Sequence, residues 1–322
     1  MLPGHALTQR GHKVAIDGTM PKWVQEGGCD VVVAQRTCNI GASNRWKELA
    51  RSGKSKLVFE IDDDLWNIDR SNKTALQFYD DELRMQQSAF LDAGNQRRLI
   101  ENITVADVVT VTTEPLADLV SQWNPNVHIL PNCIPAWMLD QPMPQQQTER
   151  VTIGWGGSPS HTRDFGELAK PLKRVLQRFG DSTEFHCMGP DYTDRVTSLK
   201  GRTRHTGWFN GVEDYLKAID FQIGVVPLRP STFTDAKSDL KLLELSALGI
   251  PTIVSPTGPY ARAIASGAPA RTAGDHKAWE RELVDLIQSP ADRETLGKEA
   301  REWAATRVID QHAHHWEDAY SN

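Results

Sequence analysis

Two successive series of alternating strand and helix patterns constrain the fold of this chain more than any other feature. Strand patterns lie at 30–34, 56–61, 108–111 and 127–130 in the first half, and at 151–154, 184–188, 221–226 and 251–254 in the second. Helical patterns separate these strand patterns. Two of the strand patterns are β-branched runs with little alternation, which is typical of parallel strands that are covered by helices on both faces. The pattern therefore predicts an α/β fold with two parallel sheets.

A proline- and glutamine-rich stretch separates the two series. It contains Pro131, Pro135, Pro142, Pro144 and three glutamines at 145–147. Such a composition is typical of a connection between domains. We predict an N-terminal domain over 1–140, a linker over 141–150, a C-terminal domain over 151–305 and a last helix over 306–322 that could pack back on the N-terminal domain. Ligands of such sheets bind beyond the carboxyl ends of the strands, so we expect the two sheets to face a central cleft.

The N-terminal domain begins in an unusual way. A helix pattern over Pro3–Arg10 comes first, and a short strand pattern over Lys13–Ile16 follows it. A Rossmann-like domain normally begins with its central strand, so either this domain lacks its usual first strand or the start of the chain is truncated relative to its relatives. A polar stretch from Thr74 to Ala106 is expected to be largely helical.

Composition and charge exclude several classes of protein. The 322 residues carry a net charge of −6 without a basic run, which disfavours nucleic-acid binding by bulk electrostatics and leaves only a local basic groove open. No apolar stretch approaches the roughly 20 residues of a membrane span. The four cysteines form no C-x-x-C pair, which favours free thiols and a reducing cytoplasm.

The strand at 221–226 and the helix expected over Asp239–Leu248 carry the most informative motif. Lys237 and Ser238 stand at the start of this helix, where free backbone N–H groups favour a diphosphate. Glu244 follows two turns later. From the helix alone, Glu244 is either a carboxylate on the solvent face or a ligand of the bound molecule.

A glycine-rich turn follows the strand at 151–154. Gly156, Gly157 and Ser158 can expose N–H groups to phosphate, with His161 and Arg163 as further contacts. Glycine-rich turns are also common in strand-to-helix connections that bind nothing. The three consecutive carboxylates Asp62, Asp63 and Asp64 follow the strand at 56–61, where they either face the ligand or form a solvated loop.

The motifs together resemble family-4-like GT-B glycosyltransferases. The resemblance rests on the segment 221–254, on Ala106–Thr113 and on Leu130–Cys133, and it extends over nearly the whole chain. The pattern Lys237-Ser238-x-x-Lys241-x-x-Glu244 and the run Asp62–Trp66 are similar to a phage and surface-polysaccharide group of these enzymes. The first glutamate of the family motif falls at Ala236, so the chain departs from the pattern there.

The resemblance implies a GT-B fold of two Rossmann-like domains and the transfer of a sugar from a nucleoside-diphosphate donor, with retention of configuration. Glu244 would bind the ribose and Trp208 would line the base pocket, although Trp208 can equally be a core residue. Asp62, Asp63 and Asp64 would face the acceptor, and with Lys237 they are the expected catalytic residues. The expected donor-binding residues are Gly156, Gly157, Ser158, His161, Trp208, Lys237, Ser238, Lys241 and Glu244.

The resemblance implies neither a cofactor nor a metal ion, because such enzymes neutralise the diphosphate with basic side chains and helix termini. The acceptor stays open between a glycan, a protein and a modified DNA base. Two other functions also stay open: a GT-B-shaped epimerase or phosphorylase, and a catalytically inactive nucleotide-sugar-binding protein.

Overall fold

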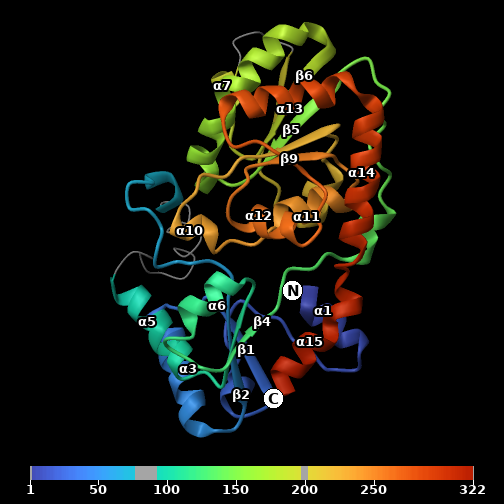
Figure 1. Cartoon of the computed structure of the whole chain (residues 1–322). Helices are drawn as coiled ribbons and strands as arrows, with labels where there is room; N and C mark the ends of the chain where they lie inside the picture. Colours follow the sequence, from blue (N-terminus) through green and yellow to red (C-terminus); the bar gives the residue numbers. More distant parts are fainter. Residues whose placement is uncertain (1, 77–92, 197–201, 322) are drawn as a thin grey trace. The chain divides into compact units, whose positions relative to one another are not determined.

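The structure is a computed structural model that describes residues 2–76, 93–196 and 202–321 (Figure 1). It divides into two compact units. Unit 1 comprises Met1–Cys133, Asp235–Ser238 and Ile309–Asn322, and unit 2 comprises Ile134–Thr234 and Asp239–Val308. The predicted α/β fold with parallel sheets in two domains is confirmed.

Unit 1 contains a four-stranded sheet in the order β1-β2-β3-β4. Its strands are β1 (Val31–Gln35), β2 (Lys56–Ile61), β3 (Val108–Val111) and β4 (Val127–Ile129). All three pairings are parallel. The central strand β3 is buried along its whole length, as its unbroken apolar pattern predicts.

Helices of unit 1 pack around this sheet. They are α1 (Leu2–Gln9), α2 (Lys22–Gln25), α3 (Ile40–Ser52), α5 (Ala93–Thr104), α6 (Glu114–Val120) and α15 (Ile309–Ser321). The Asn39 side chain caps α3 by accepting the Ala42 N–H at 2.7 Å, and Gly53 ends it in the left-handed conformation. The first and last helices, α1 and α15, lie side by side (Figure 1), and Arg10 pairs with Glu317 across them.

The strand predicted over Lys13–Ile16 does not form, so this prediction is wrong. The segment has no regular secondary structure, and Val14 and Ile16 are 40% and 63% exposed. A strand requires a neighbour for its backbone hydrogen bonds, and no described strand pairs with this segment. Of the helical stretch predicted from Thr74 to Ala106, α5 lies at the end, and 77–92 lie outside the described residues.

Unit 2 contains a six-stranded parallel sheet in the order β10-β9-β8-β5-β6-β7. The strands are β5 (Val151–Gly156), β6 (Thr183–Met188), β7 (Thr203–Thr206), β8 (Ile223–Val226), β9 (Thr252–Val254) and β10 (Arg271–Thr272). The neighbouring strands β5 and β8 are wholly buried, so they form the centre of this unit.

Helices cover both faces of the second sheet. They are α7 (Thr162–Phe179), α8 (Thr193–Val196), α9 (Val212–Lys217), α10 (Thr232–Asp235), α11 (Leu240–Ala247), α12 (Gly258–Ala265), α13 (His276–Gln288) and α14 (Pro290–Ala305). Three short 3-10 helices, η1 (Ala136–Asp140), η2 (Pro159–His161) and η3 (Gly180–Ser182), complete the fold. Phe165 of α7 and Trp279 of α13 belong to one apolar cluster, whereas Leu243 of α11 and Ala304 of α14 belong to another. The three layers that result are typical of doubly wound α/β domains.

The segment expected to be the linker, 141–150, lies within unit 2. Arg293 of α14 binds Gln146 there through its side-chain oxygen at 2.9 Å and its backbone oxygen at 2.6 Å. None of the helices in the described ranges combines the length and the apolar character that crossing a lipid bilayer requires.

Candidate functional site

The turn that follows β5 is built from glycines whose neighbours leave no room for a side chain. A Cβ on Gly157 would come within 2.8 Å of the Trp155 ring, and one on Gly189 within 2.2 Å of the Gly157 carbonyl oxygen. Gly189 also has a left-handed backbone with φ of +100°. The Gly157 N–H donates to the Met188 carbonyl at 3.1 Å. The exits of β5 and β6 therefore meet backbone against backbone, which only glycine permits.

His161 stands at the end of this turn and is held by a buried carboxylate. Its Nδ1 lies 2.8 Å from Oδ2 of Asp164, and the other oxygen of Asp164 accepts the backbone N–H of Arg229 at 2.9 Å. Because a carboxylate only accepts hydrogen bonds, the proton of this pair is on Nδ1. Arg229 follows β8, so Asp164 connects the exits of the two central strands. Ser158 contacts the hydroxyl of Ser160 at 2.6 Å.

Lys241 and Glu244 lie one turn apart on α11. The Lys241 ammonium donates to the carbonyl oxygen of Gly156 at 2.5 Å and so holds the first residue of the glycine turn. Burial raises the pKa of the Glu244 carboxyl group, and the charge of Lys241 partly offsets this effect. Within the part of the chain that the structure describes, the Glu244 carboxylate has no hydrogen bond or ion pair, and its oxygens are not sealed from solvent. Glu244 is therefore a partly buried carboxylate without a hydrogen-bond partner in the described part of the chain.

Trp208 follows β7 and is 64% exposed. Its alternative role as a core residue is therefore wrong. The adjacent Phe209 packs instead against the core, with its ring 6.2 Å from that of Tyr215. An exposed indole is available to stack on a planar ligand.

The aspartates that follow β2 differ in their surroundings. Arg36 binds Asp62 with two nitrogens and donates to Asp63 at 3.2 Å. Arg36 directly follows β1, the neighbour of β2, and its φ of +47° is positive, which is unfavourable for a residue with a side chain. Two carboxylates and a strained arginine thus share one edge of the sheet. Such strained backbone is often found at functional sites.

Asp64 belongs to the turn itself. It is 2% exposed, and it accepts hydrogen bonds from the backbone of Trp66 and from both the backbone and the side chain of Asn67. Burial raises the pKa of its carboxyl group, while these hydrogen bonds oppose the rise. The contacts indicate that Asp64 stabilises the loop rather than facing a ligand.

The helix expected over Asp239–Leu248 is α11 in the structure, with Asp239 as its N-cap residue. The Asp239 side chain makes no capping hydrogen bond and pairs with Arg307. Lys237 and Ser238 precede the helix and belong to unit 1. There Lys237 donates to Asp63 at 3.0 Å, and Ser238 accepts from the amide of Asn132 at 2.7 Å.

Ten of the twelve predicted site residues form two groups, one in each unit, and Asp64 and Trp208 belong to neither. The first lies at the exits of β5, β6 and β8 in unit 2 and contains Gly156, Gly157, Ser158, His161, Lys241 and Glu244. The second lies in unit 1 and contains Asp62, Asp63, Lys237 and Ser238. Lys237 and Ser238 were predicted to bind the donor together with the residues of the first group, but they belong to unit 1.

Arg36 and Asp164 are not among the predicted site residues, because neither stands in a motif. Arg36 pairs with Asp62, which is 26 residues away in the sequence, and Asp164 pairs with His161 within one helical turn. The i, i+3 spacing of His161 and Asp164 was a usable signal, because residues three apart face one another at a helix start.

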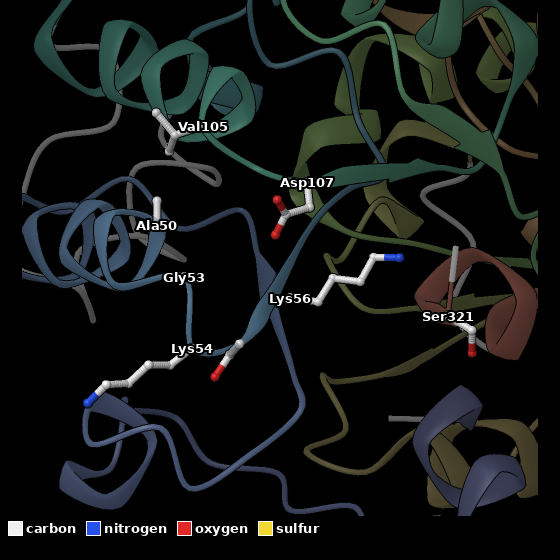
Figure 2. Close-up of a pocket in the computed structure, with 8 residues that line it drawn as sticks. Ala50, Gly53, Lys54, Lys56, Val105, Asp107 and Ser321 are labelled. Carbon is white, nitrogen blue, oxygen red and sulfur yellow. The ribbon is translucent and has the colours of Figure 1, made fainter.

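A separate pocket lies in unit 1 at the amino ends of β2 and β3. It has a volume of about 450 Å³ and is lined by Lys54, Lys56, Asp107 and Ser321 among others. Figure 2 shows Lys54 and Lys56 pointing in opposite directions, so their charges do not converge on one point. None of the predicted site residues lines it. Among the described residues, no group of three or more His, Cys, Asp and Glu side chains is arranged to hold a metal ion.

No protein-family model and no curated protein matches the chain. Solved structures match it in fold. The TarM structure aligns with a TM-score of 0.60 and 14% identity over 91% of this chain and 55% of TarM, so the chain spans little more than half of TarM. A UDP-forming α,α-trehalose-phosphate synthase from Burkholderia xenovorans aligns with a TM-score of 0.61 and 11% identity, over 91% of this chain and 74% of the other.

HepE from Anabaena, solved in complex with UDP, aligns with a TM-score of 0.62 and 11% identity over 92% of this chain and 80% of HepE. These similarities concern the fold, because the sequence identities are low. The chain has the α/β fold with two parallel-sheet domains of GT-B glycosyltransferases such as TarM and HepE.

Proposed function

We propose that this chain is a glycosyltransferase that moves a sugar from a nucleoside-diphosphate donor to a hydroxyl group of an acceptor. The observation that carries the proposal is Glu244, a carboxylate whose pKa is raised by burial and that has no partner in the described part of the chain. A partly desolvated carboxylate without a hydrogen bond costs folding free energy. A ligand that donates hydrogen bonds to this carboxylate removes that cost and therefore binds favourably. The adjacent hydroxyls of a ribose are such donors.

The surrounding residues suit the diphosphate of the same donor. Gly156, Gly157 and Ser158 present backbone close to the ligand, Lys241 holds the turn, and His161 has one ring nitrogen fixed by Asp164. Positive and N–H groups at this position would stabilise the charge that develops on the leaving diphosphate. Trp208 would stack on the base.

The acceptor would lie at the second group of residues, in unit 1. Asp63, with Asp62 beside it, would orient or deprotonate the acceptor hydroxyl, and Lys237 would add positive charge. We infer that the reaction retains configuration, needs no metal ion and takes place in the cytoplasm, in keeping with four free cysteines. The acceptor would be a glycan, a protein or a modified DNA base, as in the phage and surface-polysaccharide group.

Complexes of proteins with similar folds support a nucleotide-sugar donor. HepE was solved with UDP, and a TarM mutant was solved with Fondaparinux, alpha-GlcNAc-glycerol and UDP. Such ligands belong to those proteins, and they make UDP a reasonable first probe for this one.

The test is incubation of the protein with a panel of UDP-, GDP-, ADP- and dTDP-sugars, with and without EDTA. Slow release of the nucleoside diphosphate that EDTA does not reduce is the expected result. Isomerised sugar without release would indicate an epimerase, and binding without turnover would indicate an inactive binding protein. Loss of release in EDTA with recovery in manganese would contradict metal independence.

A further inference from the structure

Tyr215 of α9 lies beside Gly156, the first residue of the glycine turn. Its ring packs among apolar residues of unit 2. Its hydroxyl lies so close to Gly156 that a Cβ on that glycine would come within 2.6 Å of the oxygen. Gly156 therefore leaves the space that the tyrosine hydroxyl occupies.

The hydroxyl of Tyr215 has no hydrogen-bond partner in the described ranges, and it is not sealed from solvent. Buried tyrosines usually bind a partner through their hydroxyl, because an unpaired polar group costs free energy. Tyr215 and Glu244 are therefore alike: each carries a polar group that is partly buried and has no hydrogen-bond partner among the described residues.

The two groups also lie near one another. Burial and the negative charge of Glu244 both raise the pKa of the Tyr215 hydroxyl, so that it stays protonated and able to donate. Lys241, one turn before Glu244, binds the carbonyl oxygen of Gly156. Gly156 is therefore approached by Tyr215 on its Cα side and by Lys241 at its oxygen, and Glu244 lies on the same helix face as Lys241.

We propose that Tyr215 is a further binding residue, whose hydroxyl and the Glu244 carboxylate together hold the two adjacent hydroxyls of the nucleotide's ribose. The inference rests on the proposed function and adds the group that distinguishes ribose from 2′-deoxyribose. Glu244 accepts a hydrogen bond from the 3′ hydroxyl of the ribose, and Tyr215 exchanges a hydrogen bond with the 2′ hydroxyl. A nucleotide that lacks the 2′ hydroxyl leaves one of these groups unsatisfied.

The test measures calorimetric affinities of the full chain for UDP, GDP and ADP, for the 2′-deoxy form of each, and for dTDP. The wild type should prefer the ribonucleotide about three- to tenfold, the size expected of one neutral hydrogen bond. Tyr215→Phe, which removes only the hydroxyl, should reduce this preference towards one. Tyr320→Phe is the matched control, because it removes a hydroxyl from a buried tyrosine of unit 1.

Each other outcome has a definite meaning. An unchanged preference in Tyr215→Phe, with the protein folded by circular dichroism, would overturn the inference and leave the proposed donor site standing. If the wild type binds dTDP but none of the three ribonucleotides, the inference fails and the proposed donor site stands. If it binds none of the four nucleotides, the donor site itself fails, and the inference with it. Gly156→Ala gives a second check: its Cβ displaces the Tyr215 hydroxyl, so the same loss of preference is expected there, with Tyr215 intact.

Discussion

The carboxylate of Asp164 divides its two oxygens between Nδ1 of His161, at 2.8 Å, and the backbone N–H of Arg229, at 2.9 Å. The first bond orients an imidazole at the end of the glycine turn, and the second fixes the loop that follows β8. The buried side chain of Asp164 therefore fixes both the orientation of the His161 ring, which we place at the diphosphate, and the position of the loop that follows β8.

Asp164→Asn should weaken binding of a nucleoside diphosphate about tenfold. The asparagine side chain has one oxygen that accepts and one NH₂ group that donates, so it can accept a hydrogen bond from only one of the two partners, His161 and Arg229. The measurement is a double-mutant cycle with His161→Gln, read as calorimetric affinity for UDP. The two losses should be strongly non-additive if Asp164 acts through His161. Full additivity would mean that Asp164 stabilises only the β8 loop.

Glu244→Gln should raise stability while it weakens donor binding. The pKa of Glu244 is raised from 4.5 in the folded chain, so above that pH the unfolded chain loses this proton before the folded chain does. The wild type therefore loses stability as the pH rises from 4.5 through the folded pKa, and the glutamine variant does not.

The two readouts for Glu244→Gln are the melting temperature as a function of pH and the affinity for UDP. The melting temperature of the variant minus that of the wild type should increase from acidic to neutral pH. Its affinity should fall about tenfold to a hundredfold, since a hydrogen bond to a charged group is lost. Equal affinity would remove Glu244 from the site.

The aspartates that follow β2 should separate into two roles. Asp63→Asn should abolish transfer to an acceptor and leave calorimetric binding of UDP intact, since Asp63 is the aspartate that contacts both Arg36 and Lys237. Asp64→Asn is the matched control, because Asp64 is engaged by its own turn. Transfer that survives in the Asp63 variant but fails in the Asp64 variant would reverse this assignment.

Arg36→Gly should be more stable than Arg36→Ala by about 1 kcal/mol, because glycine tolerates a positive φ and alanine does not. Both variants lose the same pairs with Asp62 and Asp63, so only the backbone differs between them. Denaturant unfolding measures the difference. Equal stabilities would show that the φ of +47° carries no strain.

Much of the fold follows from local patterns. Strand patterns predicted β2 at 56–61 and β3 at 108–111 with the observed bounds, because the residues of a buried parallel strand are largely apolar and can be identified within the strand itself. The same reasoning failed at Lys13–Ile16, where the pattern is present but no described strand lies beside it. A strand is stable only with a neighbour, and periodicity does not report one.

By itself, the sequence determined the fold class, the order of the strands along the chain and the residue types at their exits. Glycine in the turn after β5, a lysine and a glutamate on α11 and three aspartates after β2 are all local features. Only the tertiary structure decided which of these side chains are satisfied. Arg36 meets Asp62 from 26 residues away, whereas Glu244 meets no partner among the described residues. The reason is that the charge, burial and hydrogen bonding of a side chain depend on neighbours from other elements, and the sequence orders these elements along the chain without bringing them together.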